Sequence, residues 1–193
     1  NSWINGFRID IKQLEANDVK YSNLKFEIAK ELGTDAGLFS SPKRLGHFLF
    51  TELGLTPHDH TPSGNPGTSK GDLMWIEYAL KQRGDPKALI VRKILEAKEA
   101  STLYSKYVKT MKEALAHTGD GYIYSSPRLF GTYTGRMTYS NSVTHKDPDK
   151  ETKTKYKTSI AMHQIPRKAK DIRASMMPPE GHDILEFDAA GQE

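Results

Sequence analysis

A carboxylate near the end of the sequence, Asp188, has the position after a strand at which proteins commonly hold a metal ion. Residues 183–187 (DILEF) predict a strand, Asp188 follows that strand directly, and Glu193 comes later in the same segment. A strand fixes the backbone and points the next side chain into a cleft, and Mg²⁺ binds one or two carboxylates together with substrate phosphate oxygens. Taken alone, Asp188 has a simpler interpretation, because an aspartate after a strand more often caps a helix.

Other polar residues are candidates for nucleic-acid contacts. In Thr134-Gly135-Arg136 the glycine allows a close backbone approach and the guanidinium reaches outward, although the same residues also suit a surface turn. His163 beside Gln164 is either a nucleic-acid contact or a packed imidazole. His58 and His60 flank a carboxylate in a polar loop, but no further metal ligand lies near them in the sequence.

Composition excludes several classes of protein. The 193 residues include no cysteine, which excludes disulfide frameworks, zinc ribbons and thiol enzymes. The formal net charge of +4 is too small to indicate nucleic-acid binding by itself. No apolar run approaches the roughly 20 residues of a membrane span, and residues 1–10 do not have the pattern of a signal peptide. We therefore expect no membrane partner and a cytoplasmic location.

The first part of the sequence predicts helices that end at glycines. Apolar periodicity predicts a helix up to Gly33, one from Ser41-Pro42 to Gly54, one from Thr68 or Ser69 to Gly84, and a long one from Asp85-Pro86 to Gly119. Residues 56–71 are rich in Pro and Gly and predict a loop. The long helix carries several lysines, which either form a solvated face or lie beside a polyanion; they are Lys93, Lys98, Lys106, Lys109 and Lys112.

After Gly119 the pattern changes from helices to strands. Residues 122–124 and 129–133 predict short strands, and residues 141–158, which are almost free of apolar side chains, predict an exposed irregular loop. Helices followed by strands indicate an α+β fold.

Several stretches resemble family A DNA polymerases, in the order in which that family has them. SSPKRLGHFLFTELGL and SGNPGT resemble thumb segments, and LYSKYVKTM resembles the long thumb helix. GYIYSSPRLFGTYTGRM leads to the Thr-Gly-Arg signature, and HQIPRKAKDIRASMMPPEGHDILEFDAAGQE resembles the succession that ends in motif A. Each stretch alone is weak evidence for the family, but the order that they share with it is a strong signal. The DAAGQE form is closer to the phage branch.

The resemblance implies an incomplete right-hand fold and a function. Residues 1–118 would form the helical thumb with its flanking helices, and residues 119–193 the start of the palm, with the basic loop 141–158 inserted. The implied activity is DNA-directed DNA polymerisation by nucleotidyl transfer to a primer. The implied partners are primer–template DNA and deoxynucleoside triphosphates, and the implied cofactor is a pair of Mg²⁺ ions.

The resemblance also assigns roles to individual residues. Asp188 would be a metal ligand and catalytic, the carbonyl of Ala189 would contact a metal ion, and Glu193 would exclude a ribose 2′-hydroxyl. The incoming nucleotide would contact three residues of this motif: Ala189, Gly191 and Glu193. The DNA would contact Ser105, Thr134, Arg136, Gln164 and Arg173.

The sequence also departs from the family pattern. Ala161, His163 and Tyr104 stand where the family has Asn, Gln and Lys, so these roles cannot be transferred. The inserted loop is expected either to grip DNA or a partner, or to be an inert surface. Because the fingers and the later palm carboxylates are not in this sequence, we expect a split polymerase or a fragment that needs a complementary chain.

Two other functions remain open from the sequence. The first is a non-catalytic duplex-DNA-binding module in which Asp188 has no catalytic role. The second is a helical adaptor whose long basic helix binds protein. The salt dependence of DNA affinity separates the adaptor from the other two, because only phosphate contacts weaken steeply with salt.

Overall fold

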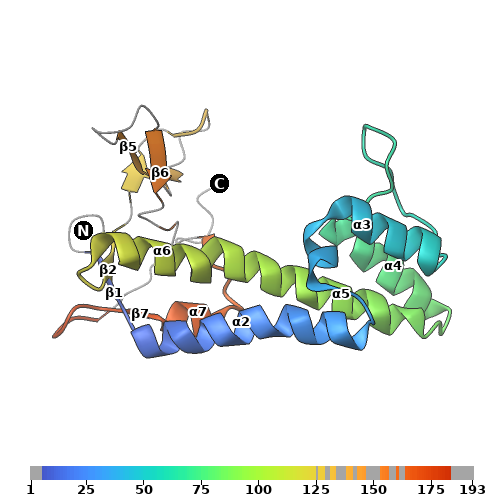
Figure 1. Cartoon of the computed structure of the whole chain (residues 1–193), viewed down its shortest axis with the longest axis horizontal. Coiled ribbons are helices and arrows are strands. Elements are labelled where there is room, and N and C mark those ends of the chain that lie inside the picture. The colour runs from blue at the N-terminus through green and yellow to red at the C-terminus, as the bar shows by residue number, and fades with distance from the viewer. Residues whose placement is uncertain are drawn as a thin grey trace, which may run out of the picture. The chain divides into compact units, whose positions relative to one another are not determined.

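The structure is a computed structural model that describes residues 6–124, 126–128, 131–133, 138–140, 143–146, 153–156, 160 and 164–183. It confirms the α+β fold class, with helices and small antiparallel sheets (Figure 1). The chain divides into two compact units. We call Val19–Tyr104 the helical unit, and Asn1–Asp18 together with Ser105–Glu193 the mixed unit.

The helical unit is built around one apolar core. Its elements are the second part of α2 (Ile11–Glu31), the 3₁₀ helix η1 (Ala36–Ser40), α3 (Pro42–Gly46), the π-helix η2 (His47–Glu52), α4 (Lys70–Gln82) and α5 (Lys87–Leu103). Leu49, Leu73 and Ile94 are fully buried at the centre of this core. Burial of these large side chains is the main stabilising contribution to the unit.

The predicted helix ends in this unit are confirmed. Gly33, Gly54 and Gly84 follow the helices with φ near +65°, a left-handed conformation that favours glycine. Ser41 accepts a hydrogen bond from the backbone N–H of Arg44 and is followed by Pro42, so it caps α3 as expected.

The predicted long helix extends from Lys87 to Thr118, but it is not a uniform α-helix. α5 is followed by the π-helical segment η3 (Tyr104–Val108) and then by α6 (Lys109–Thr118), which ends at Gly119 with φ +70°. The Thr110 hydroxyl donates to the Ser105 carbonyl at 3.2 Å. The boundary between the two units also falls in η3, between Tyr104 and Ser105.

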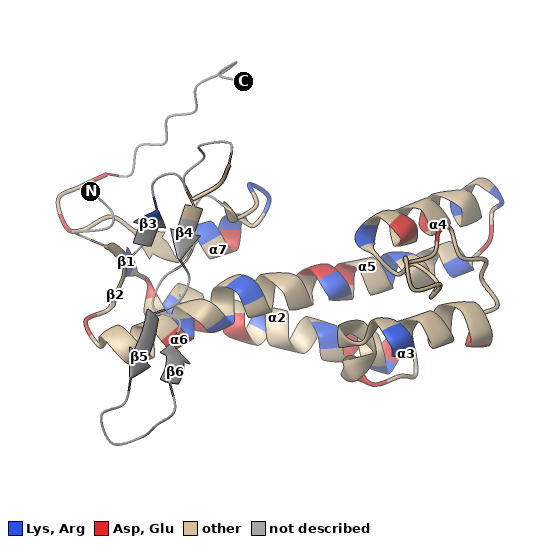
Figure 2. Ribbon diagram, turned by 90° about the horizontal axis from the view of Figure 1, so that it is seen from above, with Lys and Arg blue, Asp and Glu red and all other residues tan. Residues whose placement is uncertain are grey.

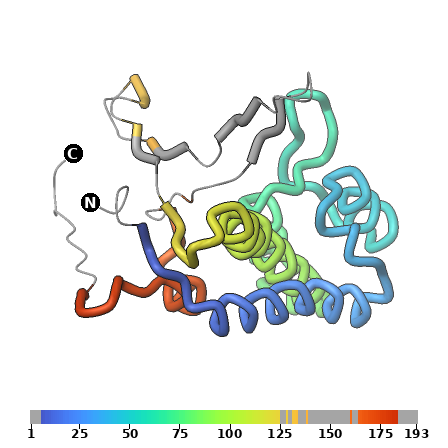
Figure 3. The backbone as a smooth tube through the Cα atoms, turned by 60° about the vertical axis from the view of Figure 1, so that its left-hand side comes forward, coloured from blue at the N-terminus to red at the C-terminus, as the bar shows by residue number. Residues whose placement is uncertain are grey.

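The mixed unit contains a three-stranded antiparallel sheet in the order β2-β1-β7. Its strands are β1 (Phe7–Ile9), β2 (Tyr122–Ile123) and β7 (Met176–Met177), and α7 (Lys170–Ala174) immediately precedes β7. Phe7 pairs with Ile123, and Ile9 pairs with Met176. The segment α7–β7 lies beside the start of α2 (Figure 3). Only the strand at residues 122–124 was expected from the sequence.

Two hairpins correct the expectations for residues 126–158. β3 (Ser126–Arg128) pairs with β4 (Thr138–Ser140), and residues 131–133 form a bend and a turn instead of the predicted strand 129–133. A side chain at Gly131 would overlap the Thr138 hydroxyl, so only glycine fits at this position.

The prediction of an irregular loop over residues 141–158 is wrong for the part of this segment that the structure describes. β5 (Val143–Lys146) pairs with β6 (Lys153–Tyr156) because Val, Thr and Tyr favour strands even between lysines.

Among the residues with described placement, no helix is long and apolar enough to span a bilayer.

Candidate nucleic-acid interface

Most of the site residues expected from the sequence lie outside the described residues. These are Thr134, Arg136, Asp188, Ala189, Gly191 and Glu193, together with the strand predicted before Asp188. Their roles remain predictions. Ser105, Gln164 and Arg173 are described, and all three belong to the mixed unit.

A tyrosine from the same segment as Ser105 bonds to the main chain of Gln164. Ser105 is exposed in η3, and Tyr107 of the same π-helical segment donates its hydroxyl to the Gln164 carbonyl at 2.5 Å. Gln164 is itself exposed. Arg173 comes from α7, and its Nη2 donates to the Ile165 carbonyl at 3.0 Å. Hydrogen bonds from η3 and α7 therefore meet at the adjacent carbonyls of Gln164 and Ile165, and Ser105 lies two residues before Tyr107 in the chain.

The lysines of the long helix are mostly bound within the protein. Lys93 pairs with Glu31, Lys109 with Glu113 at 3.9 Å, and Lys112 with Asp18 at 2.7 Å. Figure 2 shows Asp and Glu residues interspersed with the Lys and Arg residues along the helices. The charges of these three lysines are therefore balanced locally, which favours the solvated-face interpretation over a continuous basic face.

Lys98 is the most enclosed lysine of this group. Its Nζ donates to the Thr68 carbonyl at 2.6 Å, and burial lowers the pKa of its ammonium group while the negative charge of Asp72 raises it. The contact ties α5 to the loop that precedes α4. Lys98 is thus a structural link and not a surface charge.

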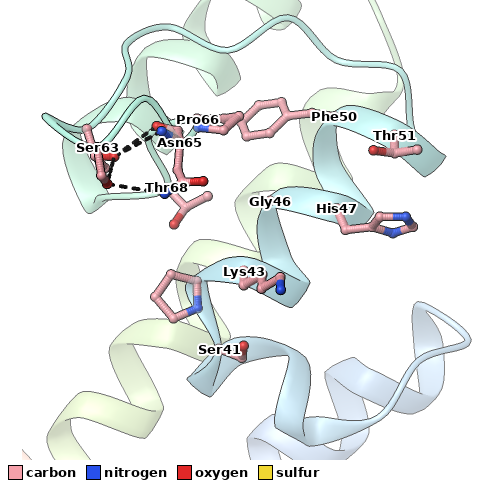
Figure 4. A pocket seen from close by; sticks show the side chains of 12 residues that line it. Ser41, Lys43, Gly46, His47, Phe50, Thr51, Ser63, Asn65, Pro66 and Thr68 are labelled. Carbon is pink, nitrogen blue, oxygen red and sulfur yellow. Dashed lines mark hydrogen bonds between the residues drawn. The ribbon is translucent and has the colours of Figure 1, made fainter.

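A groove in the helical unit has a lining that suits a nucleic-acid backbone (Figure 4). Its volume is about 580 Å³, and it lies between the α3–η2 helix and the loop before α4. The helix contributes Ser41, Pro42, Lys43, Gly46, His47, Phe50 and Thr51, and the loop contributes Thr61, Ser63, Asn65, Pro66 and Thr68. Hydroxyl, amide and ammonium donors of this kind are the groups that contact phosphate and sugar oxygens.

The loop side of the groove is held by its own hydrogen bonds. The Thr61 N–H donates to the Asn65 carbonyl at 2.8 Å, and the Asn65 side-chain amide donates to the Ser63 hydroxyl at 3.2 Å. The Gly67 N–H donates to the Asp59 carbonyl at 2.7 Å. The predicted loop 56–71 is therefore an ordered turn that presents polar side chains to the helix across the groove.

The charges on the helix side differ in their availability. Arg44 pairs with Asp35 and, by that hydrogen bond, holds the pKa of the Asp35 carboxyl below its usual value. His47 Nδ1 lies 3.1 Å from a Glu52 carboxylate oxygen. Lys43, one turn before His47, is exposed and has no ion pair in the part of the chain that the structure describes. Lys43 is therefore the cation that the groove can offer to an anionic ligand.

The sequence analysis did not identify this groove as a site. SSPKRLG was recognised as a family segment and as a helix start, but the loop residues that face it are distant in sequence. The available signal was Lys43 in the first turn of a capped helix, opposite a loop rich in Ser, Thr and Asn.

A capping box fixes the loop at the start of α4. The Asp72 carboxylate accepts from the Ser69 N–H at 2.9 Å, and the Ser69 hydroxyl accepts from the Asp72 N–H at 3.3 Å. The hydrogen bond from Ser69 is the main cause that lowers the pKa of Asp72 below its usual 3.8. A Cβ atom at Gly67 would lie 2.5 Å from Asp72 Oδ2, so glycine is required where the loop passes this carboxylate.

The charge of Asp72 predicts a pH-dependent stability of the groove loop. Since the folded pKa lies below 3.8, the stabilisation is present above that pH and is lost as the pH falls through the folded value. We expect Asp72→Asn to lower the local free energy of opening at the start of α4 by ~0.5 kcal/mol at neutral pH. Hydrogen exchange of peptides covering 68–75 measures it, and the difference from wild type should shrink as the pH falls below 3.8 and vanish below the lower, folded pKa of Asp72.

The matched control is Asp59→Asn, an exposed aspartate of the same loop that is outside the capping box. It should leave exchange at the start of α4 unchanged. An Asp72→Asn effect of equal size at every pH would show that the carboxylate charge is not the stabilising feature.

Metal binding by the histidines of this loop finds no support. His58 stacks on Trp75, with ring centroids 4.2 Å apart and planes inclined by 14°. Across the described residues, no group of three or more His, Asp or Glu side chains is placed to hold a metal ion. The predicted magnesium ligands Asp188 and Ala189 lie outside that part of the chain.

The comparisons with known proteins agree with the architecture. The model of DNA polymerase family A matches residues 11–193. The fold is similar to the Pol domain of Pol1 from M. smegmatis, solved in complex with DNA primer–template and dNTP, with a TM-score of 0.68 and 20% identity. The match covers 92% of this chain and 28% of that one. Among curated proteins, none matches in sequence.

Proposed function

Because the chain belongs to DNA polymerase family A, we propose that it supplies the DNA-holding thumb and the first catalytic carboxylate of a DNA-directed DNA polymerase. The observation that carries the proposal is the extent of the family match. Residues 11–193 include both the helical unit with its groove and the segment that ends in Asp188 and Glu193. The boundary between thumb and palm near residue 118 is part of this proposal.

The groove supports a role in holding duplex DNA. Its donors come from two facing segments, and its one unbalanced cation, Lys43, stands where a phosphodiester would sit between them. None of the lining side chains is an aspartate or a glutamate. Contacts of this kind position a duplex without reading its sequence, as a polymerase requires.

The mixed unit supports a second contact with DNA. Gln164 is exposed, Tyr107 donates to its carbonyl, and Arg173 donates to the carbonyl of Ile165 that follows. By the resemblance, Gln164, Arg173, Ser105, Thr134 and Arg136 would contact the primer–template. An arginine in the minor groove can test base-pair geometry, because the acceptors there are similar for all pairs.

The chemistry is proposed from the resemblance to motif A. Asp188 and the carbonyl of Ala189 would hold magnesium, which supplies charge stabilisation to the transferring phosphoryl group when it is bound. Ala189, Gly191 and Glu193 would contact the deoxynucleoside triphosphate, with Glu193 excluding a ribose. The phage-type branch, the complementary chain and the cytoplasmic location stay predictions.

The groove is tested by the salt dependence of DNA binding. We expect Lys43→Ala in the full-length protein to weaken binding of a primer–template and to reduce the slope of log K against log salt by about 0.9, the loss of one phosphate contact. Fluorescence anisotropy between 50 and 200 mM salt, about the range in which such contacts weaken steeply, measures both quantities.

Lys81→Ala is the matched control, since Lys81 is also an exposed lysine of the helical unit but does not line the groove. It should leave the slope within error of wild type. If Lys43→Ala leaves the slope unchanged as well, the groove does not hold a phosphate.

A further inference from the structure

Gln164 is an exposed residue that directly precedes a buried one. Ile165 is 2% exposed, and Ile160, four residues before Gln164, is also 2% exposed. Ala169 and Ile172 continue the buried side of this segment. The side chain of Gln164 is therefore presented outward from a segment whose apolar neighbours are packed in the mixed unit.

Two successive carbonyls of this segment accept hydrogen bonds from different helical elements. Tyr107 of η3 donates its hydroxyl to the Gln164 carbonyl at 2.5 Å, and Arg173 of α7 donates Nη2 to the Ile165 carbonyl at 3.0 Å. Two bonds to adjacent peptide groups restrict the rotation of the backbone at Gln164 more than either would alone. Burial raises the pKa of the Tyr107 phenol, so the hydroxyl remains a donor at neutral pH.

Both donors are themselves held in place. Tyr107 is 7% exposed and lies within the π-helical turn. Such turns displace side chains from regular α-helical positions and occur frequently at functional sites. Asn17 of α2 is 1% exposed, and its amide donates to the Asp171 carbonyl at 3.0 Å and to the Ser175 hydroxyl at 2.9 Å. These bonds fix α7, which carries Arg173.

We propose that Tyr107 is a positioning residue for DNA contact: with Arg173 it fixes the 164–165 backbone so that the Gln164 side chain meets the primer–template in one orientation. The inference rests on the proposed function, because Gln164 is taken there as a DNA contact. Tyr107 does not touch DNA in this arrangement. Its effect on binding passes entirely through the main chain of Gln164.

A double-mutant cycle on primer–template binding tests the inference. Tyr107→Phe keeps the buried ring and removes only the hydroxyl, and Gln164→Ala removes the presented side chain. In the full-length protein we expect each single variant to weaken binding by about 2- to 10-fold, the range of one hydrogen bond. The double variant should bind no more weakly than Gln164→Ala alone, because the hydroxyl acts only through that side chain.

Separate readouts exclude a merely structural effect. Tyr78→Phe, at an exposed tyrosine of α4, is the control for loss of a phenol and should bind as wild type. Arg173 is left unchanged in this test, because the proposed function makes it a DNA contact in its own right. A loss by Tyr107→Phe that only followed stability would persist in the Gln164→Ala background and would appear equally in the unfolding midpoint.

The outcomes separate the inference from the proposed function. If Gln164→Ala weakens binding but Tyr107→Phe does not, or if the two losses add independently, the inference is overturned and the DNA contact stands. If Gln164→Ala itself leaves the affinity unchanged, both the contact and the inference fail, whereas Lys43→Ala still reports on DNA binding by the helical unit.

Discussion

Asp188→Ala in the full-length protein, assembled with its complementary chain, is expected to lower the rate of nucleotide incorporation by a factor on the order of 10³ or more, because the proposed magnesium site loses its carboxylate. Primer–template affinity should stay within about twofold of wild type, since the phosphate contacts that dominate affinity lie elsewhere. Single-turnover primer extension measures the rate, and anisotropy at fixed salt measures the affinity.

Asp183→Ala is the matched control for this substitution. Asp183 is an exposed carboxylate in the same segment and has no role in the proposed site, so extension should continue at the wild-type rate. Undiminished extension by Asp188→Ala would favour the non-catalytic duplex-binding module. Loss of DNA binding together with activity would indicate that Asp188 is structural.

The features that follow from local chemistry were predictable from the sequence. The helix ends at Gly33, Gly54 and Gly84 could be located because glycine adopts positive φ at little cost. The helix starts at Ser41 and Ser69 could be located because a hydroxyl accepts hydrogen bonds from N–H groups that the helix itself leaves unpaired. Each signal lies within a few residues of the feature it determines.

The features that were missed depend on partners far apart in the sequence. β1 has only three residues, and it becomes a strand by pairing with residues 122–123 and 176–177. Lys112 finds its partner in Asp18, so a face that suggested a polyanion is balanced inside the protein. The π-helical turn at Tyr104–Val108 has no distinct signature in the apolar periodicity of the long helix.

The same distinction between local and long-range signals applies to the candidate site. The residue types of the groove were visible in SSPKRLG and in the loop, but only the fold shows that Lys43, Ser63 and Asn65 line one groove (Figure 4). Likewise, Gln164 was a candidate from its resemblance alone. The bonds that restrain its backbone come from Tyr107, 57 positions earlier, and from Arg173, and no local pattern indicates them.

The core of the helical unit gives a prediction for stability with a large expected effect. Leu73 of α4 is 0% exposed at the centre of the apolar core, and Met74, its neighbour on the same helix, is 53% exposed. We expect Leu73→Ala to destabilise the unit by about 2–5 kcal/mol, because it removes buried methyl groups and leaves a cavity. Met74→Ala should cost less than about 0.5 kcal/mol.

Hydrogen exchange of peptides from α4 and α5 in the full-length protein, followed over a urea series, measures the two free energies locally. The pair is a sharp test of the helix register, since a rotation of α4 by one residue would exchange the buried and the exposed position. Equal losses for the two variants, or a larger loss for Met74→Ala, would contradict this packing. Destabilisation by Leu73→Ala should also weaken DNA binding through the groove. α4 packs on the core that supports α3 and η2 on one side of the groove, and its capping box holds the loop on the other side.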